Sequence, residues 1–274
     1  MKSGKWNARL VRARDLAKKH TYAAEALRFY EHVVQFQQSF YSHIEKECGA
    51  EKEFRALGSL RQELDLFVLL PKFAPFLSVV EEHAPEALSA AAQSLRTNNT
   101  SVWQNTLTGF WQPEAAAPAQ KEDVLSADEL LAWMFLQPYA EYLADHSDHP
   151  PLHSAPSRCP MCVSKPQVGA LRPEGDGGKR TLTCSLCATE WDYRRIVCAS
   201  CGEEDVNKLA VYTAEGMPHV RVEACDTCHR YIKTVDLTKD GHAVPVVDEL
   251  ATIPLNLWAA ERGYAKLQMN VLGI

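Results

Sequence analysis

Eight of the nine cysteines in this chain form four Cys-X-X-Cys pairs within a stretch of about 70 residues. The pairs are Cys159/Cys162, Cys184/Cys187, Cys198/Cys201 and Cys225/Cys228. Between the first and second pairs lie 21 residues, between the third and fourth 23, and between the middle two 10. Each tight turn can aim two sulfurs at one ion, and a hairpin-sized gap can bring the next pair to its other side. Four thiolates then complete a tetrahedron, which suits Zn²⁺ or a single iron.

Two ways of combining the pairs are open. In sequential pairing, neighbours along the chain share an ion and form two ribbons; in interleaved pairing, the first pair joins the third and the second joins the fourth. The near-equal gaps of 21 and 23 residues favour sequential pairing. Disulfides are the alternative to metal. A thioredoxin-like redox motif needs only one pair in a strand–helix context, and this pattern does not provide it. Cys48, outside the pairs, is expected to be an ordinary buried or half-buried thiol.

The expected compartment is a reducing cytosol, where clustered cysteines more often bind metal than form disulfides. The first ten residues lack the apolar core of a secretory signal, and no run of about 18 apolar residues predicts a membrane span. Residues 1–19 contain seven Lys or Arg and one Asp. We interpret them as a solvated, partly frayed helix end, with a mitochondrial presequence as the alternative.

The first half of the sequence is predicted to be helical, because apolar residues recur at steps of three and four. Ser126 and Glu129 have the spacing of a capping box. Thr100 or Ser101 is expected to cap the start of the helix that follows it, through Val102 and Phe110. The expected helices cover residues 22–46, 60–70 (ended by Pro71), a segment from about 73, 85–96, 102–110 and 126–143, with a linker at 112–123.

A Pro-rich segment containing His146, His149 and His153 follows these helices. Pro150 and Pro151 break any shared helical face, so solvated linker histidines are favoured over a histidine metal site. After it, short Val-, Ile-, Thr- and Tyr-rich segments separated by turn residues predict antiparallel hairpins. The predicted strand segments are residues 170–172, 180–183, 191–197, 209–213, 220–224 and 231–236. A last helix is expected over 247–267, where Pro254 allows division into two.

The predicted fold class is therefore α+β: an all-α N-terminal domain, tandem rubredoxin-like or zinc-ribbon modules of short antiparallel hairpins, and a C-terminal helix. The expected divisions are residues 1–145 (helical domain), 146–157 (linker), 158–197 (first ribbon), 198–242 (second ribbon) and 243–274 (C-terminal helical segment).

Charge bears on the role of the ribbons. Residues 157–242 contain twelve Lys or Arg and twelve Asp or Glu, and eight thiolates with two divalent ions add a net −4. A module that binds phosphates is usually basic, so nucleic-acid binding is disfavoured; the small patches are Lys179-Arg180 and Arg194-Arg195. Catalytic zinc keeps an open coordination position, which four cysteines close. One-electron transfer by a tetrathiolate iron remains as the redox alternative.

The cysteine motifs resemble those of the formate dehydrogenase accessory proteins, the FdhE family. The similar segments are Cys159-Pro-Met-Cys162, Leu182-Thr-Cys184-Ser-Leu-Cys187-Ala-Thr-Glu-Trp191, Cys198-Ala-Ser-Cys201-Gly202, Glu223-Ala-Cys225-Asp-Thr-Cys228-His-Arg-Tyr231-Ile-Lys233, Asp248-Glu-Leu-Ala-Thr-Ile253 and Ala260-Glu-Arg-Gly-Tyr264. The resemblance implies a cytoplasmic bacterial protein that assists maturation of respiratory formate dehydrogenase by contacting its catalytic subunit. It also implies two rubredoxin-like sites associated with iron, with all eight cysteines as ligands.

Some positions depart from the pattern of this family. Val163 stands where glycine often follows the first pair, and His229 follows the fourth, so both turns are expected to be weaker. Asn256 stands where an acidic residue is expected. Trp191 is expected to cover a cluster sulfur or to lie in the hairpin core. Glu190 and Arg195 are expected to form a surface pair or to meet the partner enzyme.

Overall fold

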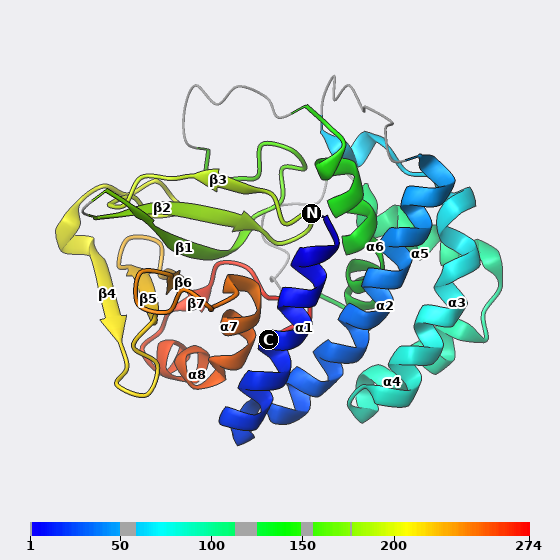
Figure 1. The fold of residues 1–274 in the computed structure, drawn as a ribbon, viewed down its shortest axis with the longest axis horizontal. Coiled ribbons are helices and arrows are strands. Elements are labelled where there is room, and N and C mark those ends of the chain that lie inside the picture. The colour runs from blue at the N-terminus through cyan, green and yellow to red at the C-terminus, as the bar shows by residue number, and fades with distance from the viewer. Residues whose placement is uncertain (1, 50–58, 113–124, 149–155, 176) are drawn as a thin grey trace.

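The computed structural model describes residues 2–49, 59–112, 125–148, 156–175 and 177–274. Figure 1 shows α2–α6 gathered on one side of the molecule and the sheet on the other, with α1, α7 and α8 between them. The predicted fold class, helices followed by cysteine-containing hairpins and C-terminal helices, is confirmed. No helix in the described ranges is both long and apolar enough to cross a bilayer.

Side chains cap three helices of the first half, α3, α5 and α6. Ser126 and Glu129 form the predicted capping box, whereas Asn99, not Thr100 or Ser101, caps α5 by accepting a hydrogen bond from the Val102 amide. The elements are α1 (Lys2–Lys19), η1 (Thr21–Ala23), α2 (Ala24–Cys48), η2 (Leu60–Gln62), α3 (Leu66–His83), α4 (Glu86–Arg96), α5 (Thr100–Trp111) and α6 (Ala127–Asp145). The predicted linker at 112–123 lies almost wholly outside the described residues.

The helix α6 is the centre of the helical half. Every residue from 131 to 144 is buried, so the helix is enclosed on all sides and continues through Pro138. A carboxylate lies in this buried stretch: Glu141 is fully buried and forms ion pairs with Arg9 (2.8 Å) and Lys5 (2.9 Å). Burying such a charge costs free energy unless it is paired, so these contacts attach α1 to α6.

The prediction of a solvated, partly frayed N-terminal helix end is wrong. Residues 1–19 are not a solvated helix end, because Trp6, Leu10, Ala13 and Leu16 of α1 are buried in the main core. Their basic residues serve partly as ion-pair partners for buried carboxylates. These partners lie more than 130 residues away in the sequence, so local pattern does not reveal them.

The third helix corrects another expectation. Pro71 does not end a helix; α3 runs through both Pro71 and Pro75. Both prolines, like Phe67, are exposed, so they lie on the solvent-facing side at steps of four. The carbonyls that lose their amide partners there can be hydrated, while Phe73 and Phe76 on the opposite face are fully buried.

The second half builds one mixed sheet in the order β3-β2-β1-β6-β5-β4, with β7 added beside β6. Two modules repeat the same plan: a cysteine pair, a strand, a strand ending in a cysteine, a second pair and a third strand. The strands are β1 (Pro166–Glu174), β2 (Gly177–Cys184), β3 (Glu190–Asp192), β4 (Leu209–Thr213), β5 (Val220–Cys225), β6 (Arg230–Asp236) and β7 (Ala265–Lys266), with η3 (Val206–Lys208) before β4. Within each module the strands are antiparallel, as predicted.

Parallel pairing of β1 with β6 joins the two modules, and the sequence did not predict it. At this seam Gly169 lies opposite Thr234, and a Cβ at Gly169 would lie 3.3 Å from the Thr234 Cβ and closer still to its hydroxyl oxygen. Thr234 is β-branched and fully buried, so it has little freedom to move away. Glycine thus permits the close approach of the two modules.

Gly169→Ala is expected to lower the free energy of unfolding by about 1–3 kcal/mol, because the added methyl group overpacks the seam. Urea denaturation measures the loss. Gly178→Ala is the matched control in β2: its Cβ would lie 3.6 Å from the nearest atom, an ordinary contact. Equal stability of the Gly169 variant and the parent would show that the seam is not tightly packed.

Two short helices, α7 (Pro245–Ala251) and α8 (Ile253–Glu261), follow β6, as Pro254 allows. A buried carboxylate also connects this region to the sheet. Glu249 lies 2.8 Å from Lys233 of β6 and 2.5 Å from Lys266 of β7, and accepts a hydrogen bond from Asn270. One acidic side chain therefore holds a helix, two strands and the C-terminal segment together.

Candidate metal sites

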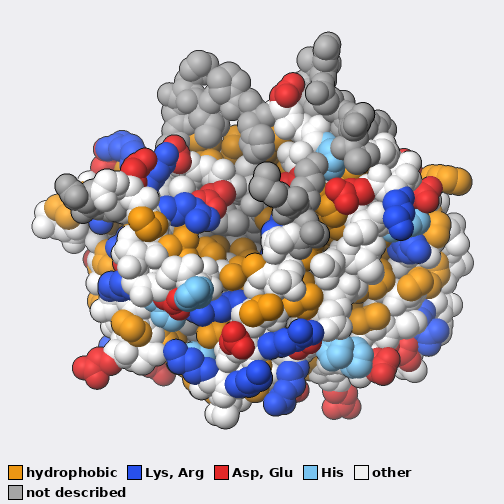
Figure 2. All heavy atoms as spheres, viewed as in Figure 1, with side chains coloured by type: hydrophobic (Ala, Val, Ile, Leu, Met, Phe, Trp, Pro, Cys, Tyr) orange, Lys and Arg blue, Asp and Glu red, His pale blue; other side chains and the backbone are white. Residues whose placement is uncertain are grey.

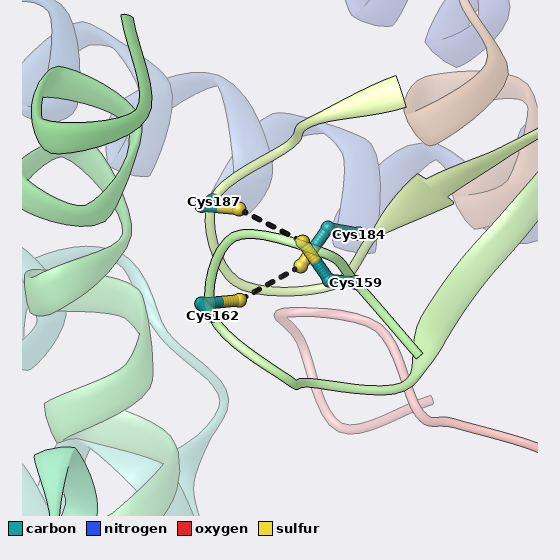
Figure 3. A group of neighbouring side chains, drawn as sticks. All are labelled: Cys159, Cys162, Cys184 and Cys187. Atoms are coloured by element: carbon teal, nitrogen blue, oxygen red, sulfur yellow. Dashed lines mark hydrogen bonds between the residues drawn. The ribbon is translucent and has the colours of Figure 1, made fainter. Parts of the chain in front are cut away.

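The first group of sulfurs comes from the first two cysteine pairs, which we call site 1. Figure 3 shows Cys159, Cys162, Cys184 and Cys187 pointing toward one another from two facing turns. The sulfurs of Cys159 and Cys187 are 3.5 Å apart and those of Cys162 and Cys184 are 3.3 Å apart. All four sulfurs lie within 4.8 Å of one another.

The second group, site 2, has the same plan. Cys198 and Cys201 face Cys225 and Cys228, with sulfur–sulfur distances of 3.8 Å (Cys198–Cys228) and 3.7 Å (Cys201–Cys225). A tetrahedron of metal–sulfur bonds of about 2.3 Å has edges of about 3.8 Å, which site 2 matches and site 1 approaches. All these separations far exceed a disulfide bond of about 2.05 Å. The structure thus groups the cysteines sequentially rather than in the interleaved way.

Every cysteine pair is followed by a residue in the left-handed backbone region. Val163, Ala188, Gly202 and His229 have φ values of 63°, 53°, 78° and 53°. Three of the four are not glycine, so the turns form despite the absence of the expected residue. Backbone amides two residues after the first cysteine also point at sulfur: Met161, Leu186 and Ser200 lie 3.4, 3.4 and 3.3 Å from Cys159, Cys184 and Cys198 Sγ.

Val163→Gly is expected to stabilise the protein by about 0.5–1 kcal/mol, because a β-branched residue is strained at positive φ and this side chain is 54% exposed. Gly202→Val is the reverse experiment at the equivalent turn, and should cost about 1–2 kcal/mol although its Cβ would meet nothing within 4 Å. Thermal unfolding of metal-loaded protein measures both. Opposite signs would contradict the strain argument.

Charge determines what these groups can hold. Burial raises the pKa of the Cys184 and Cys187 thiols well above the usual range, and neighbouring cysteines add to the rise. Burial also raises the pKa of Cys198 to about 12. Hydrogen bonds from the neighbouring cysteines hold the pKa of Cys162 below its usual range, so one thiolate is accommodated, but Cys184 and Cys187 cannot ionise beside it without compensating positive charge. A soft divalent cation supplies it and accepts sulfur ligands, so both sites fit zinc or iron in chemistry and geometry.

Other predicted residues lie as follows. Trp191 is buried in the same core as the site 1 cysteines, with its indole N–H donating to the Pro156 carbonyl. Glu190 pairs with Arg172 rather than with Arg195. Asn256 accepts a hydrogen bond from the Tyr231 hydroxyl. His146 Nδ1 lies 2.7 Å from the Tyr142 carbonyl oxygen, whereas His149 and His153 fall outside the described residues.

Arg61 is a neighbour of site 1 that the sequence did not reveal. Its guanidinium donates to the carbonyls of Phe110 and Trp111 and to Ser164 Oγ. Burial lowers the pKa of Arg61, while all four site 1 cysteines act in the opposite direction. A cation fixed here can balance a tetrathiolate complex, which carries a net charge of −2 with a divalent ion. Nothing in the local sequence indicates this role, because Arg61 lies about 100 residues from the first cysteine pair.

A third group of potential ligands, His219, Asp240 and Asp248, also lies together. Here the position for a cation is taken by Arg12, which pairs with Asp248 at 2.5 Å and with Asp240 at 2.7 Å. We therefore interpret this group as a structural ion-pair network.

The cysteine-containing half matches two family models. Residues 158–195 match the FdhE central domain and residues 182–272 match the FdhE C-terminal domain. Together these matches span residues 158–272, less than half of the chain, so over its cysteine-containing half the chain is similar to the FdhE family. An FdhE homolog of Aquifex aeolicus is 28% identical over 94% of this chain and 92% of its own length. An FdhE homolog of Pseudomonas aeruginosa is 40% identical over 42% of this chain and 38% of its own length.

The fold is also shared with a solved FdhE structure. The crystal structure of the FdhE protein from Pseudomonas aeruginosa has a TM-score of 0.67, covering 98% of this chain and 95% of that one at 24% identity. The likeness thus includes the helical half, where the sequence alone offered no sharp FdhE motif.

Proposed function

We propose that this chain is a member of the FdhE family and a non-catalytic accessory factor for the maturation of respiratory formate dehydrogenase. In this proposal it binds the catalytic subunit of that enzyme in the bacterial cytoplasm, with a metal ion at each tetracysteine site. The observation that carries it is the pair of four-sulfur groups within the region that matches the FdhE domains. Cys159, Cys162, Cys184 and Cys187 would hold one ion, and Cys198, Cys201, Cys225 and Cys228 the other.

The arrangement of ligands favours an accessory role over catalysis. An ion with four cysteine ligands has no open position for substrate or water, so each site would stabilise a fold or present a surface. In site 1 the first pair precedes β1 and the second pair connects β2 to β3, so bound metal would fix the position of the strands. The chemistry supplied by the ion is therefore chiefly cross-linking of the chain.

The experiment uses a bacterium that makes respiratory formate dehydrogenase, and it combines a pull-down with the tagged chain and deletion of the gene for the chain. The tagged full-length chain should capture the catalytic subunit, and loss of the chain should lower formate dehydrogenase activity. Wild type and Cys48→Ser, a change outside both sites, should restore activity. No association with the subunit, together with normal activity after deletion, would refute the proposal.

A second candidate is electron transfer, because a single tetrathiolate iron can cycle by one electron and Cys201 is exposed to solvent. Reversible one-electron titration of bound iron would support it, and native protein containing zinc alone would exclude it.

Nucleic-acid binding is less well supported, because carboxylates neutralise most of its candidate patches. Lys179 pairs with Asp192, Arg180 with Glu223 and Arg194 with Glu204. Figure 2 shows both signs of charge intermixed on the face in view. A protein that binds phosphates through a basic surface would instead leave such cations available.

A further inference from the structure

The two tetracysteine sites differ in how they are exposed. The four site 1 cysteines are between 1% and 3% exposed. At site 2, by contrast, Cys201 is exposed and Cys228 is half-buried, although Cys198 and Cys225 are buried. Two ligands of site 2 can therefore be reached from solvent without movement of the core.

Helical elements cover site 1 and hold both of its turns. The Leu60 amide donates to the Met161 carbonyl at 2.9 Å, and the Trp133 indole donates to the Ser185 carbonyl at 3.1 Å. All four cysteines belong to the main hydrophobic core. A cavity of about 410 Å³ reaches Cys162, yet this residue is only 1% exposed. Opening site 1 would thus require separating the ribbon from the helices.

The turns of site 2 are held by surface contacts within the C-terminal half. Thr227 Oγ1 donates to Glu203 at 2.6 Å, which connects the two turns directly. Tyr264 donates to Asp226 at 2.5 Å, and the Ala265 amide donates to the His229 carbonyl. These contacts lie at the edge of the molecule, so one turn can open at a lower free-energy cost than the packed core.

An apolar cavity of about 160 Å³ lies beside site 2 and gives an approach to Cys198 and Cys225. Ile196, Val206 and Val211 line it and are 56%, 63% and 54% exposed. An incoming ligand with an apolar portion could be seated here next to the sulfurs.

We propose that site 2 is an exchange site, where an outside thiol replaces Cys201 on the bound ion, while site 1 releases its ion far more slowly. With an ion held by the four cysteines of site 2, the incoming sulfur would donate an electron pair to that ion as the bond from the ion to Cys201 Sγ breaks. Cys201 leaves with its electron pair and takes up the proton that the incoming thiol loses. No atom changes oxidation state, so the step needs no oxidant or reductant. The inference rests on the metal binding proposed above.

The test uses full-length protein loaded with two zinc ions per chain. The chelator 4-(2-pyridylazo)resorcinol removes zinc while iodoacetamide pulses label the released thiols for mass spectrometry. We expect two release phases of one ion each, the first faster by about tenfold or more. Labelling during the first phase should fall on Cys198, Cys201, Cys225 and Cys228, and labelling of the other four should follow the second phase.

A variant and its match sharpen the result. Cys201→Ser should abolish the first phase and leave the second unchanged, while Cys162→Ser, at the equivalent turn of site 1, should leave the first phase in place. If the Cys162 variant does not fold, the order in which the cysteines of the parent protein are labelled still shows which site releases its ion first. Equal release from both sites, or earlier labelling of site 1, would overturn the inference. Failure to bind any zinc or iron would instead refute the proposed metal binding.

Discussion

Cys187→Ser is expected to remove one metal ion per chain and to lower the free energy of unfolding by more than about 4 kcal/mol. Cys187 is 3% exposed, and its sulfur lies 3.5 Å from that of Cys159 within the main core. Losing this ligand leaves three buried sulfurs without the cation that allows them to ionise. The helices that pack on site 1 would then lose part of their support.

Cys228→Ser is the matched control, because it changes the last cysteine of site 2. It should also remove one ion, but Cys228 is only half-buried, so the free energy of unfolding should fall less. Metal analysis and urea denaturation of both variants give the comparison. A Cys187 variant that unfolds at the same urea concentration as the parent would contradict the structural role of site 1.

Glu249→Gln is expected to lower the free energy of unfolding by about 3–5 kcal/mol, because it removes the counter-charge of the buried Lys233. Burial already lowers the pKa of Lys233 to about 7, so without Glu249 this side chain is expected to lose its proton on folding, which itself costs stability. Burial acts to raise the pKa of Glu249, but attraction from Lys233 and Lys266 outweighs it and holds the pKa at about 2. The carboxylate is therefore ionised at neutral pH, and the isosteric amide removes only its charge. Chemical denaturation at pH 7 measures the effect.

Lys266→Met provides the control for this prediction. Lys266 forms an ion pair with the same Glu249 carboxylate, but its side chain is partly exposed. Its removal leaves the buried Lys233–Glu249 pair intact. A loss of roughly 1 kcal/mol or less is expected. If Glu249→Gln costs no more than Lys266→Met, the carboxylate is not the connection between α7, β6 and the C-terminal segment.

The sequence predicted features that depend on local spacing. The grouping of the cysteines followed from the two similar gaps, and the capping box at Ser126 from its distance to Glu129. Five of the predicted strand segments match observed strands, but the segment 191–197 contributes only the end of β3 (Glu190–Asp192). Each of these features can be predicted from residues close together in the sequence or from a spacing that occurs twice.

The features that sequence reasoning missed are contacts between distant segments. Arg9 of α1 pairs with Glu141, which is 132 residues away, so the sequence of α1 alone does not indicate that this helix is buried. The parallel pairing of β1 with β6 places Gly169 opposite Thr234, and neither residue by itself predicts this pairing. The prediction that Pro71 ends a helix is wrong because the local pattern does not show that Pro71 lies on the exposed face of α3. The expected Glu190–Arg195 pair does not form, because Glu190 pairs with Arg172 on β1 of the same module.

Metal content with a thiol count tests the central claim most directly. Protein purified anaerobically from its own host should contain two ions per chain, iron or zinc, with the eight paired cysteines protected from alkylation until a chelator is added. An absorption spectrum then distinguishes the coloured iron–thiolate complex from colourless zinc. Protein without bound metal, whose cysteines are joined as disulfides within the Cys-X-X-Cys pairs, would contradict the account.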